Sequence, residues 1–116
     1  MNDKDRTILE HMIEDACDII NFSIDLSNVH DLIKFRMHRK AIVMSILNIG
    51  ELTKQLSLTF KQEHKEIPWK KISGMRDIAA HGYHIMDNDV IWIVITHFIP
   101  ELIQFLNQQL RHKEAS

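Results

Sequence analysis

The side chains best suited to chemistry lie in one short stretch of the chain, Gly74 to Tyr83. Arg76 carries a planar fork of donors that can bind a phosphate and stabilise charge developing on it. His81 can take up or release a proton near neutral pH. Asp77 could hold one ring nitrogen of His81, and Tyr83 adds a hydroxyl. If these groups converge, they suit cleavage of a phosphodiester without a metal ion.

The spacing of these residues on a helix leaves more than one interpretation open. Arg76 and His81 are five residues apart and point about 140° away from one another on a regular helix. Asp77 and His81, four apart, share a face. Either the helix breaks at Gly82, letting His81 and Tyr83 swing round, or a second subunit completes the site across a two-fold axis. An ordinary surface pair of Asp77 with His81, beside a salt bridge of Arg76, fits the same spacing.

Positive charge is concentrated in the middle of the chain. Residues 1–31 carry two cations and eight anions, whereas residues 32–76 carry ten cations and three anions, within a net charge of −2. Such a segment is typical of a phosphate-facing surface, and equally of a solvated face that neutralises an acidic neighbour. The candidate RNA contacts within it are Lys34, Arg36, Arg39, Lys40, Lys70 and Lys71.

Three other features are candidates for a site. His81 and His84 could share a metal, but no nearby carboxylate or cysteine completes a ligand set, so we expect no metal and no cofactor. Trp69 could stack on a base, although directly after Pro68 it is more typical of a core anchor. Cys17 has no basic neighbour within a helical turn and is predicted to be a buried thiol.

Hydrophobic periodicity predicts the helices that would position these residues. A first helix is expected over residues 3–25 and a second over residues 32–60. Pro68 suits the first position of a third helix, which Gly82 could end as a left-handed cap. A fourth is expected from Asp87, Asn88 or Asp89 to residue 110, with a kink near Pro100. The prediction is a small all-α up-and-down bundle of four to five helices in a single domain, residues 1–116.

One segment and one residue could contradict the predicted all-α bundle. Val90 to Ile95 has strong strand propensity, but no partner strand is evident and the helical spacing continues past it, so helix is predicted. Gly50 lies inside the second helix, where it costs about 1 kcal/mol relative to alanine. Close packing against another helix would explain the glycine.

Composition indicates in which cellular compartment the protein is expected. The 116 residues are 45% apolar and 26% charged, as in soluble globular proteins. A lone cysteine makes no internal disulfide, and no apolar signal region follows the N-terminus. The longest purely apolar run, residues 90–95, is too short to span a bilayer. We therefore expect a cytoplasmic protein with no membrane partner.

Several segments together resemble the HepT-like branch of the HEPN domains. They are Ile49–Leu52, Ile67–Ile72 and Gly74–Tyr83, whose order and spacing match, with Val90–Trp92 and Ile99–Leu102 also fitting. The resemblance covers about residues 5–110. It implies a small all-α domain that forms a homodimer through its motif-bearing face, with the motifs in a cleft between the subunits.

The resemblance also implies a function. Members of this branch are metal-independent endoribonuclease toxins of the MntA–HepT (type VII-like) toxin–antitoxin system. Their antitoxin is a minimal nucleotidyltransferase that silences the toxin by transferring AMP to the motif tyrosine. Carried over, Arg76 and His81 are the catalytic pair, Tyr83 is the AMPylation site, and Asp77 fills the polar position after the arginine. An acid there adds repulsion toward RNA phosphate.

The chemistry of these residue types is compatible with that function. His81 would assist attack by the ribose 2′-hydroxyl or protonate the leaving oxygen, giving a 2′,3′-cyclic phosphate. DNA lacks the 2′-hydroxyl and should not be cut. AMP on Tyr83 would block RNA by bulk and by charge. The alternative is a non-catalytic helical partner or substrate-binding subunit of a nucleotidyltransferase, with Arg76 and Tyr83 on its docking surface.

Overall fold

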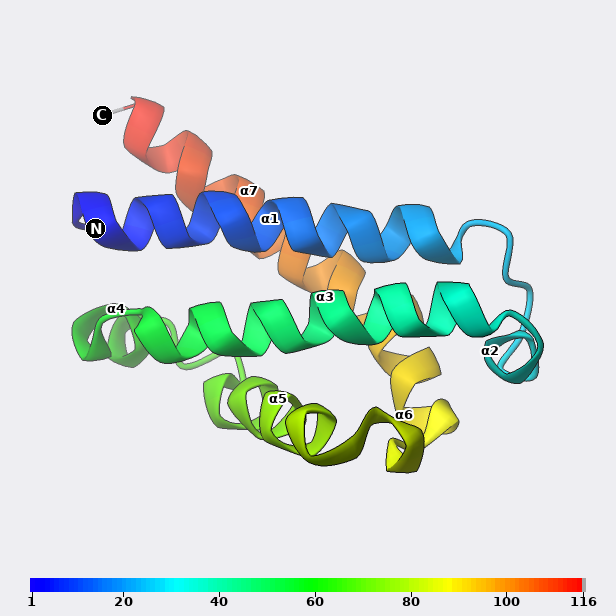
Figure 1. The fold of residues 1–116 in the computed structure, drawn as a ribbon. Helices are drawn as coiled ribbons and strands as arrows, with labels where there is room; N and C mark the ends of the chain where they lie inside the picture. Colours follow the sequence, from blue (N-terminus) through cyan, green and yellow to red (C-terminus); the bar gives the residue numbers. More distant parts are fainter. Residues whose placement is uncertain (116) are drawn as a thin grey trace.

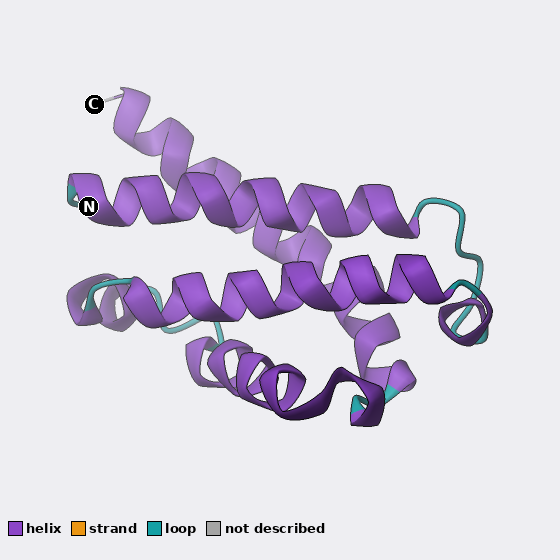
Figure 2. Cartoon of the chain, in the orientation of Figure 1, coloured by secondary structure: helices purple, strands orange, loops and turns teal. Residues whose placement is uncertain are grey.

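The computed structural model describes the backbone of residues 1–115; the side chains of Tyr83 and residues 112–115, and all of residue 116, lie outside the described part. Across the described residues the chain is helical, with no strand, which confirms the predicted all-α class (Figure 2). Helix α1 (Asp3–Ser23) lies antiparallel beside α3 (Arg36–Gln55), and α5 (Trp69–Gly82) packs on the other side of α3 (Figure 1). The C-terminal helix α7 (Ile99–Ala115) crosses behind and packs on α1.

Helix α1 follows its sequence pattern closely. The Asn2 side chain accepts a hydrogen bond from the Asp5 amide at 2.7 Å and caps the first turn. The core side of the helix carries Ile8, Leu9, Met12, Ala16 and Ile19, all of them buried. The one cysteine of this helix, Cys17, is exposed. The prediction of a buried thiol is therefore wrong. Cys17 comes one residue after the buried Ala16, and the turn of the helix places it on the solvent side.

The single helix predicted over residues 32–60 is wrong. The structure divides it into α2 (Asp31–Lys34), α3, and α4 (Leu58–Glu63). The second break has a tertiary cause: the buried Asp5 carboxylate accepts hydrogen bonds from the Ser57 amide at 2.9 Å and the Ser57 hydroxyl at 2.6 Å. The same hydroxyl accepts from the Phe60 amide at 3.1 Å and caps α4. A carboxylate on α1 thus fixes a turn 52 residues away.

The packing predicted for Gly50 is confirmed. A Cβ added at Gly50 would overlap Cβ of Arg76 and lie 3.0 Å from the carbonyl oxygen of Ile72. Both of those residues belong to α5. The glycine therefore sets how closely α3 and α5 approach, and the point of closest approach is Arg76, the candidate phosphate-binding residue.

Helix α5 begins one residue later than predicted and ends differently. Pro68 precedes it, and the Pro68 carbonyl accepts from the amides of Lys71 and Ile72 at 3.0 and 3.1 Å. The left-handed cap predicted at Gly82 is wrong, since no described glycine has a positive φ. Instead the chain tightens into the 3₁₀ segment η1 (Tyr83–Ile85).

The start of α5 is anchored by an aromatic cluster. Trp69 is buried and lies 6.1 Å, ring to ring, from both Phe60 and Phe105. Its indole N–H donates to the His64 carbonyl at 3.0 Å. Trp69 is the core anchor that its position after Pro68 indicated.

The C-terminal helical stretch contains a change of helix type rather than a simple kink. Helix α6 (Asn88–Ile93) is capped by Asp87, and residues Val94–Phe98 form the π-helical segment η2, directly before α7 and Pro100. The stretch Asn88–Arg111 is long and apolar enough to cross a membrane by length and composition alone. Within this stretch Ile91, Leu102 and Leu106 are fully buried in the core, whereas Val90 and Ile93 are exposed.

Candidate active site

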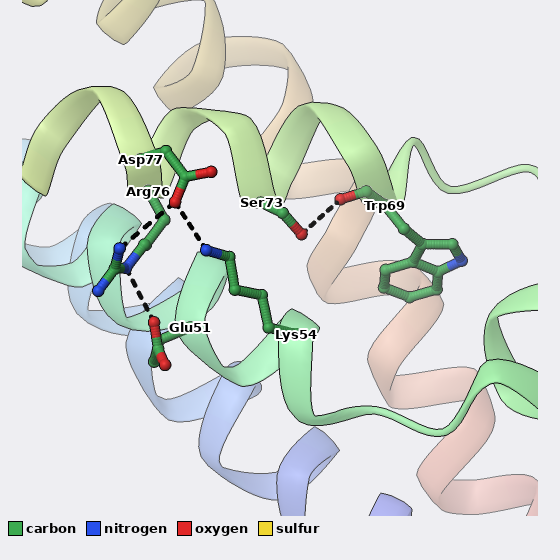
Figure 3. Close-up of polar contacts among 6 residues, drawn as sticks. All are labelled: Glu51, Lys54, Trp69, Ser73, Arg76 and Asp77. Carbon is green, nitrogen blue, oxygen red and sulfur yellow. Dashed lines mark hydrogen bonds and ion pairs between the residues drawn. The ribbon is translucent and has the colours of Figure 1, made fainter.

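Arg76 projects from the middle of α5 toward α3 and is held there by a carboxylate (Figure 3). Its Nε lies 2.8 Å from Oε2 of Glu51. The N–H is not directed along that line, so the contact is a close ion pair rather than a hydrogen bond, and both atoms are shielded from solvent. Nη1 donates to Oδ1 of Asp77 at 3.3 Å. Among the described residues, Nη2 has no hydrogen-bond or ion-pair partner.

Asp77 is drawn toward α3 rather than along its own helix. Its Oδ1 accepts a 2.6 Å hydrogen bond from Nζ of Lys54, and Figure 3 shows this oxygen between Lys54 and Arg76. The hydrogen bond from Lys54, followed by the charge of Lys54 and the contact with Arg76, holds the pKa of Asp77 below its usual range. The Asp77–His81 pair considered from the spacing does not form in this structure.

Glu51 and Lys54 are the two site residues to which the sequence assigned no role, although Glu51 lies in the Ile49–Leu52 segment of the resemblance. They lie on successive turns of one face of α3, and Gly50 brings that face against α5. The available signal was the glycine itself. A glycine inside a helix marks a close approach, and charged residues next to it are the first candidates for contacts across that approach.

His81 lies in the last turn of α5 and is exposed. No described residue makes a hydrogen bond or ion pair with its ring. Helix α5 is continuous from Trp69 through Gly82, so no break reorients His81 relative to Arg76. The guanidinium of Arg76 nevertheless reaches Asp77, which occupies the His81 face one turn earlier. The backbone of Tyr83 follows in η1, and its side chain lies outside the described residues.

The six candidate RNA contacts do not form one patch. Arg36, Arg39 and Lys40 line a cavity of about 310 Å³ together with His84 of η1. Lys34 does not line this cavity; its Nζ lies 5.5 Å from the centre of the Phe35 ring. At the other end of α5, Lys70 lines a separate groove, and the neighbouring Lys71 is exposed.

One of these cations has a structural task. Arg39 donates from Nε to Oδ1 of Asn88 at 2.7 Å and from Nη2 to the carbonyl of Met86 at 3.0 Å. It therefore ties α3 to the segment that follows Tyr83. Among the described residues, no group of three or more histidine, cysteine, aspartate or glutamate side chains is arranged to hold a metal ion.

This all-α bundle, with an arginine and a histidine on its central motif helix, matches the family model described as "Ribonuclease HepT-like" over residues 9–109. The chain belongs to the HepT-like ribonuclease family, a branch of the HEPN domains, as the resemblance indicated.

Individual relatives agree with the family match. "Putative RNase TTE0752" of Caldanaerobacter subterraneus subsp. tengcongensis is 32% identical over 109 residues, covering 94% of this chain and 96% of that protein. "Putative RNase MJ0127" of Methanocaldococcus jannaschii is 29% identical, covering 95% of this chain and 90% of that protein. "Probable ribonuclease HepT" of Thermococcus cleftensis is 37% identical over 62 residues, about half of each chain. No solved structure matches.

Proposed function

We propose that this protein is an endoribonuclease that cleaves RNA through attack of a ribose 2′-hydroxyl on the adjacent phosphorus, without a metal ion. Family membership supports the reaction class. The observation that carries the assignment to residues is the state of Arg76. One edge of its guanidinium is held by Glu51, while Nη2 is left without a partner among the described residues. A donor held in this way can bind the phosphate and stabilise its developing charge.

His81 is the proton-transfer group in this proposal. It is exposed, and its ring makes no hydrogen bond or ion pair with a described residue, so a substrate can reach it. It either removes the proton of the 2′-hydroxyl or delivers one to the leaving oxygen. Asp77, with its negative charge directed to Lys54 and Arg76, acts on Arg76 rather than on His81.

A homodimer completes the proposed site. Because α5 is continuous, Arg76 and His81 of one chain leave the helix about 140° apart. A second subunit related by a two-fold axis would present its own pair across the interface. Large apolar side chains near the motif support such an interface: Ile78 on α5 is 52% exposed and Ile85 on η1 is 77% exposed. Burial of these two side chains would favour association.

Regulation by a nucleotidyltransferase antitoxin is the remaining part of the proposal. Tyr83 lies two residues beyond His81, so AMP on its hydroxyl would place bulk and negative charge next to the proton-transfer group. The protein would then act as the toxin of a toxin–antitoxin pair. Mass spectrometry of protein co-expressed with its partner should find AMP on Tyr83, and expression without the partner should arrest growth.

The central experiment measures cleavage of single-stranded RNA in EDTA by the wild type, by His81→Ala and by Arg76→Lys. We expect cleavage by the wild type, a 2′,3′-cyclic phosphate product, and activity lost in both variants with unchanged circular dichroism. The matching DNA strand should stay intact. A fully active His81→Ala would refute the mechanism. A wild type that cleaves no RNA but forms a stable complex with the nucleotidyltransferase would instead identify a non-catalytic subunit.

A further inference from the structure

A second depression lies on the motif helix, apart from Arg76. It is a groove of about 530 Å³ between α4 and α5, lined by Leu58, Lys61, Gln62, Lys65, Trp69, Lys70, Ser73, Gly74 and Asp77. This volume falls within the range of small-molecule sites. We call it the α4–α5 groove.

The walls of the groove are apolar and its ends are basic. Leu58 is 68% exposed and forms one wall, and Trp69 forms part of the other, held rigidly by its hydrogen bond to His64. A Cβ added at Gly74 would meet nothing within 4 Å, so the groove is open at this position. An apolar wall beside open space suits the flat face of a nucleobase.

The charge of the groove favours an anionic occupant. Its lining includes Lys61, Lys65 and Lys70 but only one acid, Asp77. The Asp77 carboxylate already faces Lys54 and Arg76, which offset its charge. The groove is therefore positive along its rim. Amines spaced around an apolar floor bind phosphates while bases pack between them.

The groove leads directly to the proposed proton-transfer residue. Lys70, Gly74 and Asp77 occupy one face of α5, and His81 lies on that same face, seven residues after Gly74. At 1.5 Å per residue this places His81 ~10 Å along the helix from Gly74. An RNA strand with its scissile phosphate at His81 can therefore continue along α5 into the groove.

We propose that the α4–α5 groove binds nucleotides of the RNA substrate beyond the two that share the scissile phosphate. This proposal rests on the ribonuclease function proposed above. It predicts that a longer RNA is bound and cleaved better than a dinucleotide, because only the longer strand reaches Lys65 and Lys70. The groove would thus select for length, whereas Arg76 and His81 act on any phosphodiester that they can reach.

Gly74 provides a clean test, since a Cβ added there meets no atom within 4 Å. Gly74→Glu places a carboxylate in the groove, and Gly74→Ala is the matched control for loss of the glycine. On a ten-nucleotide single-stranded RNA we expect kcat/KM to fall roughly tenfold in Gly74→Glu, because a negative charge opposes the phosphates. Gly74→Ala should match the wild type. On a dinucleotide all three proteins should be equal.

Salt dependence supplies a second readout that a structural defect would not change. Each lysine that neutralises one phosphate of a single strand contributes about 0.7 to the slope of log K against log salt concentration. Lys65→Gln should therefore lower the slope by about 0.7, whereas Lys4→Gln, an exposed control on α1, should leave it unchanged. Binding is measured by fluorescence anisotropy of the labelled ten-nucleotide RNA in a His81→Ala background.

The outcomes separate this proposal from the function on which it rests. If the wild type cleaves RNA but Gly74→Glu treats both substrates as the wild type does, the groove assignment is refuted and the ribonuclease stands. If no RNA is cleaved, the ribonuclease fails, and the anisotropy data alone decide whether the groove binds RNA. If Gly74→Glu instead weakens self-association in sedimentation velocity, or binding of the nucleotidyltransferase, with RNA binding unchanged, the occupant is a protein and the proposal is wrong.

Discussion

The contact between Gly50 and α5 gives the sharpest prediction, which concerns Gly50→Ala. The added methyl would overlap Cβ of Arg76 and lie 3.0 Å from the Ile72 carbonyl oxygen. Neither atom is the flexible end of a side chain, so α3 and α5 must move apart. Overpacking of this kind costs up to ~3 kcal/mol. Alanine recovers ~1 kcal/mol of helix propensity. We expect the free energy of unfolding to fall by ~2 kcal/mol.

Urea unfolding followed by circular dichroism measures this loss, and in a domain of this size the melting temperature should drop by ~8 °C. Gly74→Ala is the matched control on α5, where the added methyl meets nothing and the helix propensity gain should appear as stabilisation of up to ~1 kcal/mol. The two glycine variants should therefore change stability in opposite directions.

The catalytic consequence of Gly50→Ala should exceed the loss of folded protein. Most of the variant remains folded at 25 °C if the wild type has an ordinary stability of 5–15 kcal/mol. Separating the helices, however, moves Arg76 relative to Glu51, whose charged atoms now lie 2.8 Å apart. Misplacement by about 1 Å can reduce a rate about 10²-fold. A Gly50→Ala protein as stable and as active as the wild type would refute the view that this approach positions Arg76.

Three further predictions concern the charged groups of the described structure. Glu51→Gln keeps the shape but removes the charge that holds Nε of Arg76, so kcat for RNA cleavage should fall at unchanged melting temperature, and equal kcat would contradict the positioning role. The lowered pKa of Asp77 means that its contacts stabilise the fold above the ordinary value of 3.8 and are lost as pH falls through the folded pKa. Asp77→Asn should therefore be less stable than the wild type at pH 7, with the difference vanishing at the acid end of a urea series. Burial raises the pKa of Asp15, so its ionised form is disfavoured in the fold, and Asp15→Asn should stabilise the protein at pH 7 but not below pH 3.8.

The parts of the fold that the sequence predicted are those decided by local pattern. Helix α1 ends within two residues of expectation because its apolar spacing and its cap are local. The apolar run at residues 90–95 is helical, as its continuing periodicity indicated. Gly50 indicated a helix contact because glycine is unfavourable inside a helix unless close packing against another element requires it.

The parts that the sequence did not predict depend on distant residues. The break between α3 and α4 is fixed by Asp5, which lies 52 residues from its partner Ser57. The pairing of Asp77 with Lys54, rather than with His81, depends on how closely Gly50 lets α3 approach α5. Spacing along one helix shows which side chains share a face. It does not show which neighbour on another helix competes for them.

The bonds of Arg39 to Met86 and Asn88 affect how mutational data on this protein should be interpreted. An alanine scan of the basic residues would register Arg39 as sensitive and place it in the RNA footprint. Its guanidinium also holds the residues directly after η1, the segment that carries Tyr83, so its loss would change the position of the segment that the proposed antitoxin would recognise. Resistance of Arg39 variants to silencing would then report on loop geometry rather than on RNA affinity.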